Sequence, residues 1–239
     1  MKVKDIQFIL DKMDENQLRH ANNTACISYA MGQAINCPPD ELEALWFAGL
    51  LLESGKLCIT NKLKNNIDTS FQDEFDILNR KEKYANYTLY TQALLKNIES
   101  LADQIDFSPA SAIIDQAEEN VDGTGYPRQL EAKEINTLSK VLRISAYYDN
   151  CRIQQHLSHE ETINDLKSHA DEYFPVKIID PFIRAIEKNN LQDDYCEERN
   201  FTIGQLTEEE KREIQDLLPE DDELTEKQSV ESKRKTKIK

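Results

Sequence analysis

The segment 38–52 constrains the fold more than any other part of the sequence. Two prolines followed by two acidic residues are typical of a first helical turn, because proline fixes a helical φ and acidic side chains favour the positive end of the helix dipole. The helix predicted over residues 40–53 then becomes apolar on every side near Phe47, Leu50 and Leu51. We therefore expect this helix to run through the core.

Apolar side chains elsewhere in the chain also recur at helical spacing. Helix-breaking residues are few, with 6 glycines and 7 prolines in 239 residues. Only scattered short stretches alternate as a strand would. The pattern predicts a polar loop over residues 60–72 and helices over residues 73–80, 84–104, 132–150, 160–172 and 175–188, with another beginning at Ser108. We predict an all-α bundle of about eight or nine helices.

The chain is expected to form one domain over residues 1–200, followed by a charged tail over 201–239. Thr207 and Glu210 have the spacing of a capping box, which predicts a short helix over 206–218. An acidic run and a basic end follow that helix, a composition typical of disorder.

Charge and cysteine content narrow the class of protein. The net charge of −16 argues against nucleic-acid binding, which requires clustered lysines and arginines. The 5 cysteines have no CxxC spacing and are interpreted as reduced and mostly buried. No signal peptide is recognisable, and the longest apolar run, residues 44–52, is too short to span a bilayer. We expect a cytoplasmic protein with no membrane partner.

The signature loop, residues 122–127, has the sequence Asp-Gly-Thr-Gly-Tyr-Pro. Asp-Gly marks a turn, the two glycines allow positive φ, and Tyr-Pro favours an extended exit from the turn. Residues 50–56, with the sequence Leu-Leu-Leu-Glu-Ser-Gly-Lys, lie upstream. Taken together, the two motifs resemble the HD-GYP family, bacterial metal-dependent phosphodiesterases that hydrolyse cyclic di-GMP. The match covers about residues 16–190 and implies an HD-superfamily bundle with the signature loop on its surface.

The resemblance also implies where metal ligands should lie. His20 matches a ligand histidine, Glu53 falls at the aspartate of the His-Asp pair, and Glu118 falls at one of two paired histidines. Four other ligand positions carry residues that donate no electron pair to a metal at neutral pH: Leu52, Lys81, Ala117 and Ala146. Because two-metal hydrolysis needs converging imidazole and carboxylate ligands, we predict no catalytic residue, no bound metal and no cofactor.

The residues that remain form a vestigial site: His20, Glu53, Lys56 and Glu118. Our preferred interpretation is that Glu53 and Glu118 pair with Lys56 and Lys81, so that the lysines replace the charge of the metal. Three alternatives stay open. His20, Glu53 and Glu118 are a legitimate ligand set for one transition metal. The chain could then be a residual phosphohydrolase. It could also bind cyclic di-GMP without cleaving it, with Lys56 and Arg143 holding the phosphates.

The preferred function is a catalytically inactive signalling or protein-interaction module. In active relatives, the signature loop is associated with contacts to GGDEF-type diguanylate cyclase domains, which implies such a domain as a partner. The residues that would form the interaction are Asp122, Gly123, Gly125, Tyr126 and Pro127. The same glycines could instead serve only to shape the turn. The remaining histidines, His156, His159 and His169, are expected at helix ends or on the surface.

Overall fold

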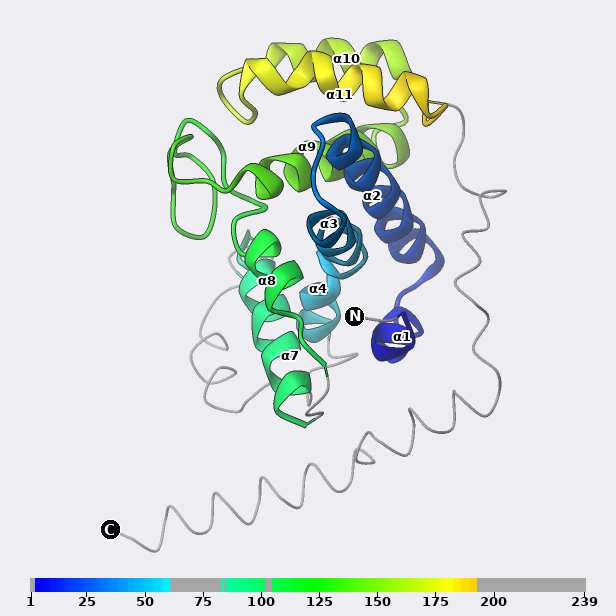
Figure 1. Ribbon diagram of the computed structural model, residues 1–239, viewed down its shortest axis with the longest axis vertical. Helices are drawn as coiled ribbons and strands as arrows, with labels where there is room; N and C mark the ends of the chain where they lie inside the picture. The colour runs from blue at the N-terminus through cyan, green and yellow to red at the C-terminus, as the bar shows by residue number, and fades with distance from the viewer. Residues whose placement is uncertain (1–2, 61–82, 84, 102–104, 193–239) are drawn as a thin grey trace, which may run out of the picture.

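The structure, a computed structural model, describes residues 3–60, 83, 85–101 and 105–192. Within these residues the regular secondary structure is all helical, joined by turns and loops that contain two isolated β-bridges. Figure 1 shows the arrangement of the elements. Their bounds are η1 (Val3–Ile6), α1 (Gln7–Leu10), α2 (Glu15–Ala34), α3 (Pro39–Leu51), α4 (Ser54–Ile59), α7 (Tyr87–Leu101), α8 (Ser108–Ile114), α9 (Thr137–Ile153), α10 (His159–Ser168) and α11 (Val176–Lys188). The predicted all-α bundle is confirmed.

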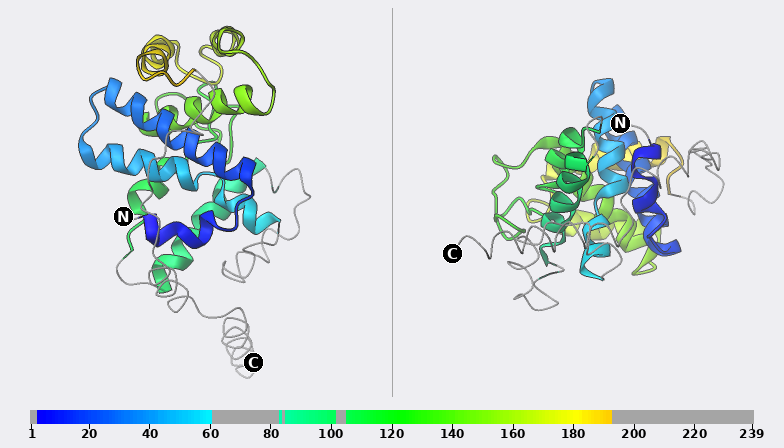
Figure 2. Two further views of the ribbon diagram at one scale, coloured as in Figure 1. Left: turned by 90° about the vertical axis from the view of Figure 1, so that its right-hand side faces the viewer. Right: turned by 90° about the horizontal axis from the view of Figure 1, so that it is seen from below.

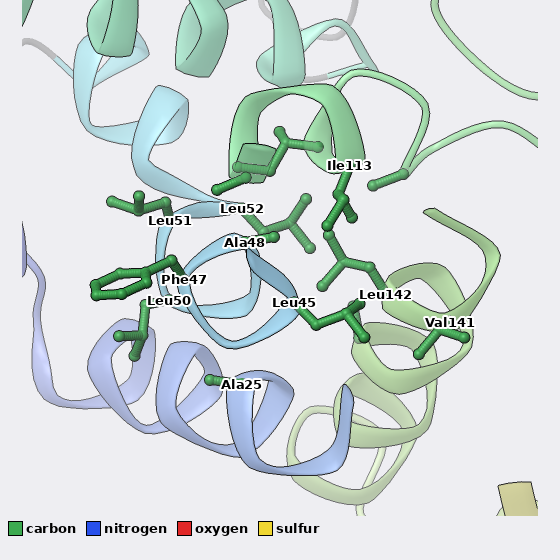
Figure 3. Packing of buried hydrophobic residues seen from close by; sticks show 14 of the residues in the cluster. Ala25, Leu45, Phe47, Ala48, Leu50, Leu51, Leu52, Ile113, Val141 and Leu142 are labelled. Atoms are coloured by element: carbon green, nitrogen blue, oxygen red, sulfur yellow. The ribbon is translucent and has the colours of Figure 1, made fainter. Parts of the chain in front are cut away.

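Helix α3 lies at the centre of the bundle, as its apolar sequence predicts. In Figure 3, Ala25 of α2 faces one side of α3, and Ile113 of α8 and Leu142 of α9 lie on other sides. Leu45 and Leu50 of α3 are completely buried. Burying a leucine contributes about 1.5–3 kcal/mol, so the buried part of α3, residues 44–51, is a principal source of the bundle's stability.

Two glycines allow helices to approach more closely than a side chain would permit. A Cβ atom on Gly49 of α3 would lie 2.4 Å from the Cα atom of Ala25 in α2. A Cβ atom on Gly55 of α4 would lie 2.1 Å from the carbonyl oxygen of Tyr87 in α7. Since both neighbours are backbone atoms, neither can move aside cheaply.

Helices α10 and α11 lie side by side across one end of the bundle, over α9 and α2 (Figures 1 and 2). No helix in the described part of the chain is long and apolar enough to cross a membrane. Four of the cysteines are described, all as free thiols: Cys26, Cys37, Cys58 and Cys151.

Some predicted helix boundaries are wrong, and a side-chain cap and a backbone turn explain two of them. The helix expected over 132–150 begins at Thr137, because the side chain of Asn136 accepts a hydrogen bond from the Leu138 amide. The helix expected over 160–172 ends at Ser168, and Asp171 soon after adopts a positive φ of 60°. The helix expected over 84–104 is α7, described from Tyr87 to Leu101. The predictions for residues 60–72, 73–80 and 201–239 lie outside the described residues.

Candidate functional site

The side chain of His20 is held in one orientation by two helices. His20 lies on α2 and is 4% exposed. Its Nδ1 atom is 2.5 Å from Oδ2 of Asp149 on α9, and the other carboxylate oxygen of Asp149 accepts a hydrogen bond of 2.9 Å from Asn23. Because the carboxylate of Asp149 accepts from both side chains, the imidazole ring is fixed with Nε2 directed away from α9.

The free edge of the His20 ring faces Glu53. Nε2 of His20 lies 3.5 Å from Oε1 of Glu53. Burial lowers the pKa of His20, but the hydrogen bond to Asp149 and the charges of Glu53 and Asp149 outweigh it, so that the pKa lies above its ordinary value of 6.5. The hydrogen bond of His20 is therefore to Asp149, and Glu53 lies beside the opposite edge of the ring.

Lys56 and Glu53 form the ion pair that the sequence predicts. Nζ of Lys56 donates to Oε1 of Glu53, and both side chains are largely buried, at 22% and 11% exposed. The same ammonium group lies 4.6 Å from the ring centroid of Tyr87, a cation–π contact. The carboxylate of Glu53 therefore has a protein cation directly beside it.

Glu118 is paired with Arg143 of α9. Its two carboxylate oxygens accept hydrogen bonds from the Tyr87 hydroxyl at 2.6 Å and from Nη1 of Arg143 at 2.9 Å. We had expected Lys81 as the partner, and Lys81 lies outside the described residues. Burial raises the pKa of Tyr87 well above 10, and the negative charges of Glu118 and Glu53 raise it further.

Tyr87 thus joins the candidate residues into one network. Glu53 lies beside His20 and forms an ion pair with Lys56. The ammonium group of Lys56 lies over the Tyr87 ring, and the Tyr87 hydroxyl donates to Glu118. All four residues named from the sequence therefore lie in one region between α2, α4, α7 and α9. Their role as a vestigial site stays a prediction.

The residues of this region do not fit a two-metal centre. Leu52, Ala117 and Ala146 are buried, at 1%, 0% and 3% exposed, and offer no donor atom. No group of three or more His, Cys, Asp or Glu side chains in the described part of the chain is placed to hold a metal ion. The two carboxylates with the right chemistry, Glu53 and Glu118, are each bonded to a cationic side chain. A divalent ion at either carboxylate would be repelled by that cation.

The signature loop lies on the surface, as predicted, and Tyr126 is 49% exposed. Its two glycines have different roles. Gly123 has a positive φ of 80°, which glycine adopts without strain. The φ of Gly125 is not positive. A Cβ atom on Gly125 would lie 2.1 Å from the backbone nitrogen of Asn120, so glycine is needed there for close packing. Of the two glycines that allow positive φ, Gly123 alone adopts it.

The buried carboxylate of Glu119 holds the segment that follows the signature loop. Glu119 is 2% exposed, and its two oxygens accept hydrogen bonds from the backbone amides of Arg128 and Leu130, at 2.7 and 2.9 Å. The side chain of Asp122 accepts from the Thr124 amide at 2.9 Å. These bonds fix both the entry to the turn and the segment that follows it.

Sequence reasoning missed Asp149, Asn23, Tyr87 and Glu119 as members of the site and its support. Asp149 could have been suspected, because it is the one carboxylate in α9, and a carboxylate that becomes buried needs a partner. The other histidines lie where they were expected. His159 begins α10 and contacts the Tyr148 hydroxyl, His169 caps the end of the same helix, and His156 is exposed.

Known proteins similar to this chain were found by sequence and by structure. A model of the HD domain family matches residues 7–178. The cyclic di-GMP phosphodiesterase PdeB of Borreliella burgdorferi is 23% identical over 184 residues, which are 75% of this chain and 45% of that protein.

Two solved structures share the fold. One is a cyclic GMP-AMP-specific phosphodiesterase of V. cholerae, V-cGAP3, with a TM-score of 0.52 and 16% identity over 90% of this chain and 54% of that one. The other is Bd1817, an HDG"Y"P protein of Bdellovibrio bacteriovorus, with a TM-score of 0.55 and 18% identity over 74% of this chain and 53% of that one. This chain spans about half the length of each of these relatives. Since the family model covers most of the chain, the protein belongs to the HD domain family.

Proposed function

We propose that this protein is a catalytically inactive HD-domain module of bacterial cyclic-nucleotide signalling, which acts by binding another protein. The observation that carries the proposal is the pairing of Glu53 with Lys56 and of Glu118 with Arg143. These are the two carboxylates that the family resemblance leaves available for a metal. The relatives are phosphodiesterases of cyclic dinucleotides, which supports a place in the same kind of signalling.

Electrostatic repulsion by Lys56 and Arg143 opposes the entry of a metal ion at these two carboxylates. Two unit charges about 4 Å apart interact by about 4 kcal/mol at an effective dielectric constant of about 20, and a divalent ion doubles that repulsion. A metal entering between Glu53 and Glu118 would have to displace both Lys56 and Arg143. Each displaced side chain would leave a partly buried position without its partner, which costs further free energy.

The same pairs weigh against the two alternative functions. A residual phosphohydrolase needs Glu53 and Glu118 as ligands, and both are bonded to cations. An effector that binds cyclic di-GMP needs Lys56 and Arg143 for the phosphates, and both are bonded to carboxylates. The acidic net charge of −16 further opposes the binding of an anionic nucleotide.

The interaction role is assigned to the signature loop. Tyr126 is one of three large apolar or aromatic side chains that are strongly exposed in the described residues, together with Leu101 and Val176. The support of the loop by Glu119 limits the conformational freedom that Tyr126 must lose on binding, which is the profile of an interface anchor. The partner class that the family resemblance implies is a GGDEF-type domain.

Binding to a purified GGDEF-type domain tests the interaction role. Tyr126→Ala is expected to weaken binding at least about tenfold while leaving the melting temperature within about 2 °C, since the side chain is exposed. Leu101→Ala is the matched control, because Leu101 is 45% exposed at the end of α7, far along the chain from the loop. Equal binding by the wild type and Tyr126→Ala would overturn the role of the loop.

A further inference from the structure

Arg143 reaches from α9 to the base of the signature loop. Its two terminal nitrogens donate to different residues: Nη1 to the carboxylate of Glu118 at 2.9 Å, and Nη2 to the side-chain oxygen of Asn120 at 3.2 Å. The Arg143 side chain is 17% exposed and that of Glu118 is 22% exposed. The fork of a guanidinium group is suited to such a double contact, because its N–H groups are held in one plane.

Glu118 and Asn120 are also the residues to which the signature loop is hydrogen-bonded. The amide of Tyr126 donates to the backbone oxygen of Glu118 at 3.0 Å, and the amide of Gly123 donates to the backbone oxygen of Asn120 at 3.0 Å. The Asn120 side chain in turn donates to the hydroxyl of Thr124 at 3.0 Å. Both ends of the turn are therefore attached to residues that Arg143 holds by their side chains.

Close packing couples the position of residues 119–120 to that of the signature loop. Gly125 lies so near the backbone of residues 119–120 that a Cβ atom would be 2.1 Å from the Asn120 nitrogen and 2.4 Å from the Glu119 Cα atom. A shift of Asn120 would therefore displace Gly125, and with it the neighbouring Tyr126.

We propose that Arg143 is a positioning residue for the signature loop: through Glu118 and Asn120 it holds the turn in the conformation that presents Tyr126. The proposal rests on the proposed function only in one respect, namely that Tyr126 is presented to a protein partner. It gives the cation beside Glu118 a second role, because the pair that excludes a metal also ties the loop to α9. The Glu118 carboxylate has a second partner in Tyr87, so the network persists in part without Arg143.

Amide hydrogen exchange in the full chain tests the proposal. In Arg143→Met, the amides of Gly123 and Tyr126 are expected to exchange at least about tenfold faster than in the wild type, because the charged hydrogen bonds that hold their acceptors are lost. Amides in the middle of α3 are expected to be unchanged. In Arg143→Lys, the charge next to Glu118 is kept but the fork is lost. The Tyr126 amide should then exchange more slowly than in Arg143→Met, while the Gly123 amide should still exchange faster than in the wild type.

Arg152→Met is the matched control. Arg152 lies on the same helix and donates to the carbonyl oxygens of Leu157 and Gln192, away from the signature loop. Its loss should leave the exchange of Gly123 and Tyr126 at the wild-type rate. If Arg143→Met does not fold, Arg143→Lys carries the test through the faster exchange of Gly123.

Two results would overturn the proposal. One is loop amides that keep their wild-type exchange rates in the Arg143 variants. The other is an acceleration of α3, α9 and loop amides by the same factor, which is the result of a general loss of stability. Neither result bears on the binding of a GGDEF-type domain. Conversely, a loosened loop with unchanged binding of that domain would support the positioning role of Arg143 and contradict the proposed role of Tyr126.

Discussion

His20 and Asp149 are 129 residues apart in the sequence, and their Nδ1 and Oδ2 atoms lie 2.5 Å from each other in the core. The contact joins α2 to α9, and the Asp149 carboxylate is completely buried. A carboxylate in such a position requires partners, which are His20 and Asn23. The pair is the part of the site in which a charge is most fully removed from water, so that pH should act on stability through it.

The first prediction concerns pH. The pKa of His20 is raised above 6.5 in the folded chain, so protonated His20 stabilises the fold below about pH 6.5, and this contribution is lost as the pH rises through the folded pKa. The free energy of unfolding of the wild type should therefore fall over that range relative to His20→Gln. Urea denaturation between about pH 5.5 and 9 measures the difference, with His156→Gln as an exposed-histidine control. Parallel curves for the wild type and His20→Gln would contradict the prediction.

The second prediction concerns the influence of Lys56 on His20. The positive charge of Lys56 lowers the pKa of His20. Replacing Lys56 by Met keeps most of the apolar stem and removes the charge, so the pKa of His20 should rise. Titration of the ring proton resonances of His20 by NMR measures the shift. Arg128→Met removes an exposed cation that pairs with Asp115 and should leave the pKa of His20 in place. A His20 pKa that is unchanged or lower in Lys56→Met would contradict the placement of Lys56 beside Glu53 and His20.

Gly49→Ala should destabilise the fold through the contact of α3 with α2. Alanine has the better helix propensity by about 1 kcal/mol, but its Cβ atom would lie 2.4 Å from the Ala25 Cα atom. Overpacking of this kind costs about 1–3 kcal/mol and more when backbone must move, so we expect a net loss of about 2 kcal/mol. Gly123→Ala is the comparison, because it tests positive φ without a clash, at a cost of about 1 kcal/mol. Unchanged stability in Gly49→Ala, measured by urea denaturation, would contradict the close approach.

The central helix could be predicted from a local pattern, because an apolar helix must be buried, which placed α3 at the centre. The surface position of the signature loop was implied by the family resemblance. The ion pair of Glu53 with Lys56 was predicted from the family resemblance, and their separation of three residues is compatible with it.

Contacts between distant residues could not be predicted in the same way. The partner of Glu118 is Arg143, which lies 25 residues later and on another helix, and several cations were equally available in the sequence. Asp149 could not be recognised as the partner of His20, because their contact depends on how α2 packs against α9. The start of α9 was misplaced because the cap at Asn136 is a side-chain effect that apolar periodicity does not register.

The central claim is that the region around Glu53 and Glu118 holds ion pairs in place of metals and is catalytically inactive. Elemental analysis of the full chain, purified from cells supplied with iron and manganese, tests it most directly when cyclic di-GMP hydrolysis is measured on the same sample. The account predicts no stoichiometric iron or manganese and no hydrolysis, with Glu53→Ala indistinguishable from the wild type. Two metal ions per chain, together with hydrolysis that Glu53→Ala abolishes, would contradict it.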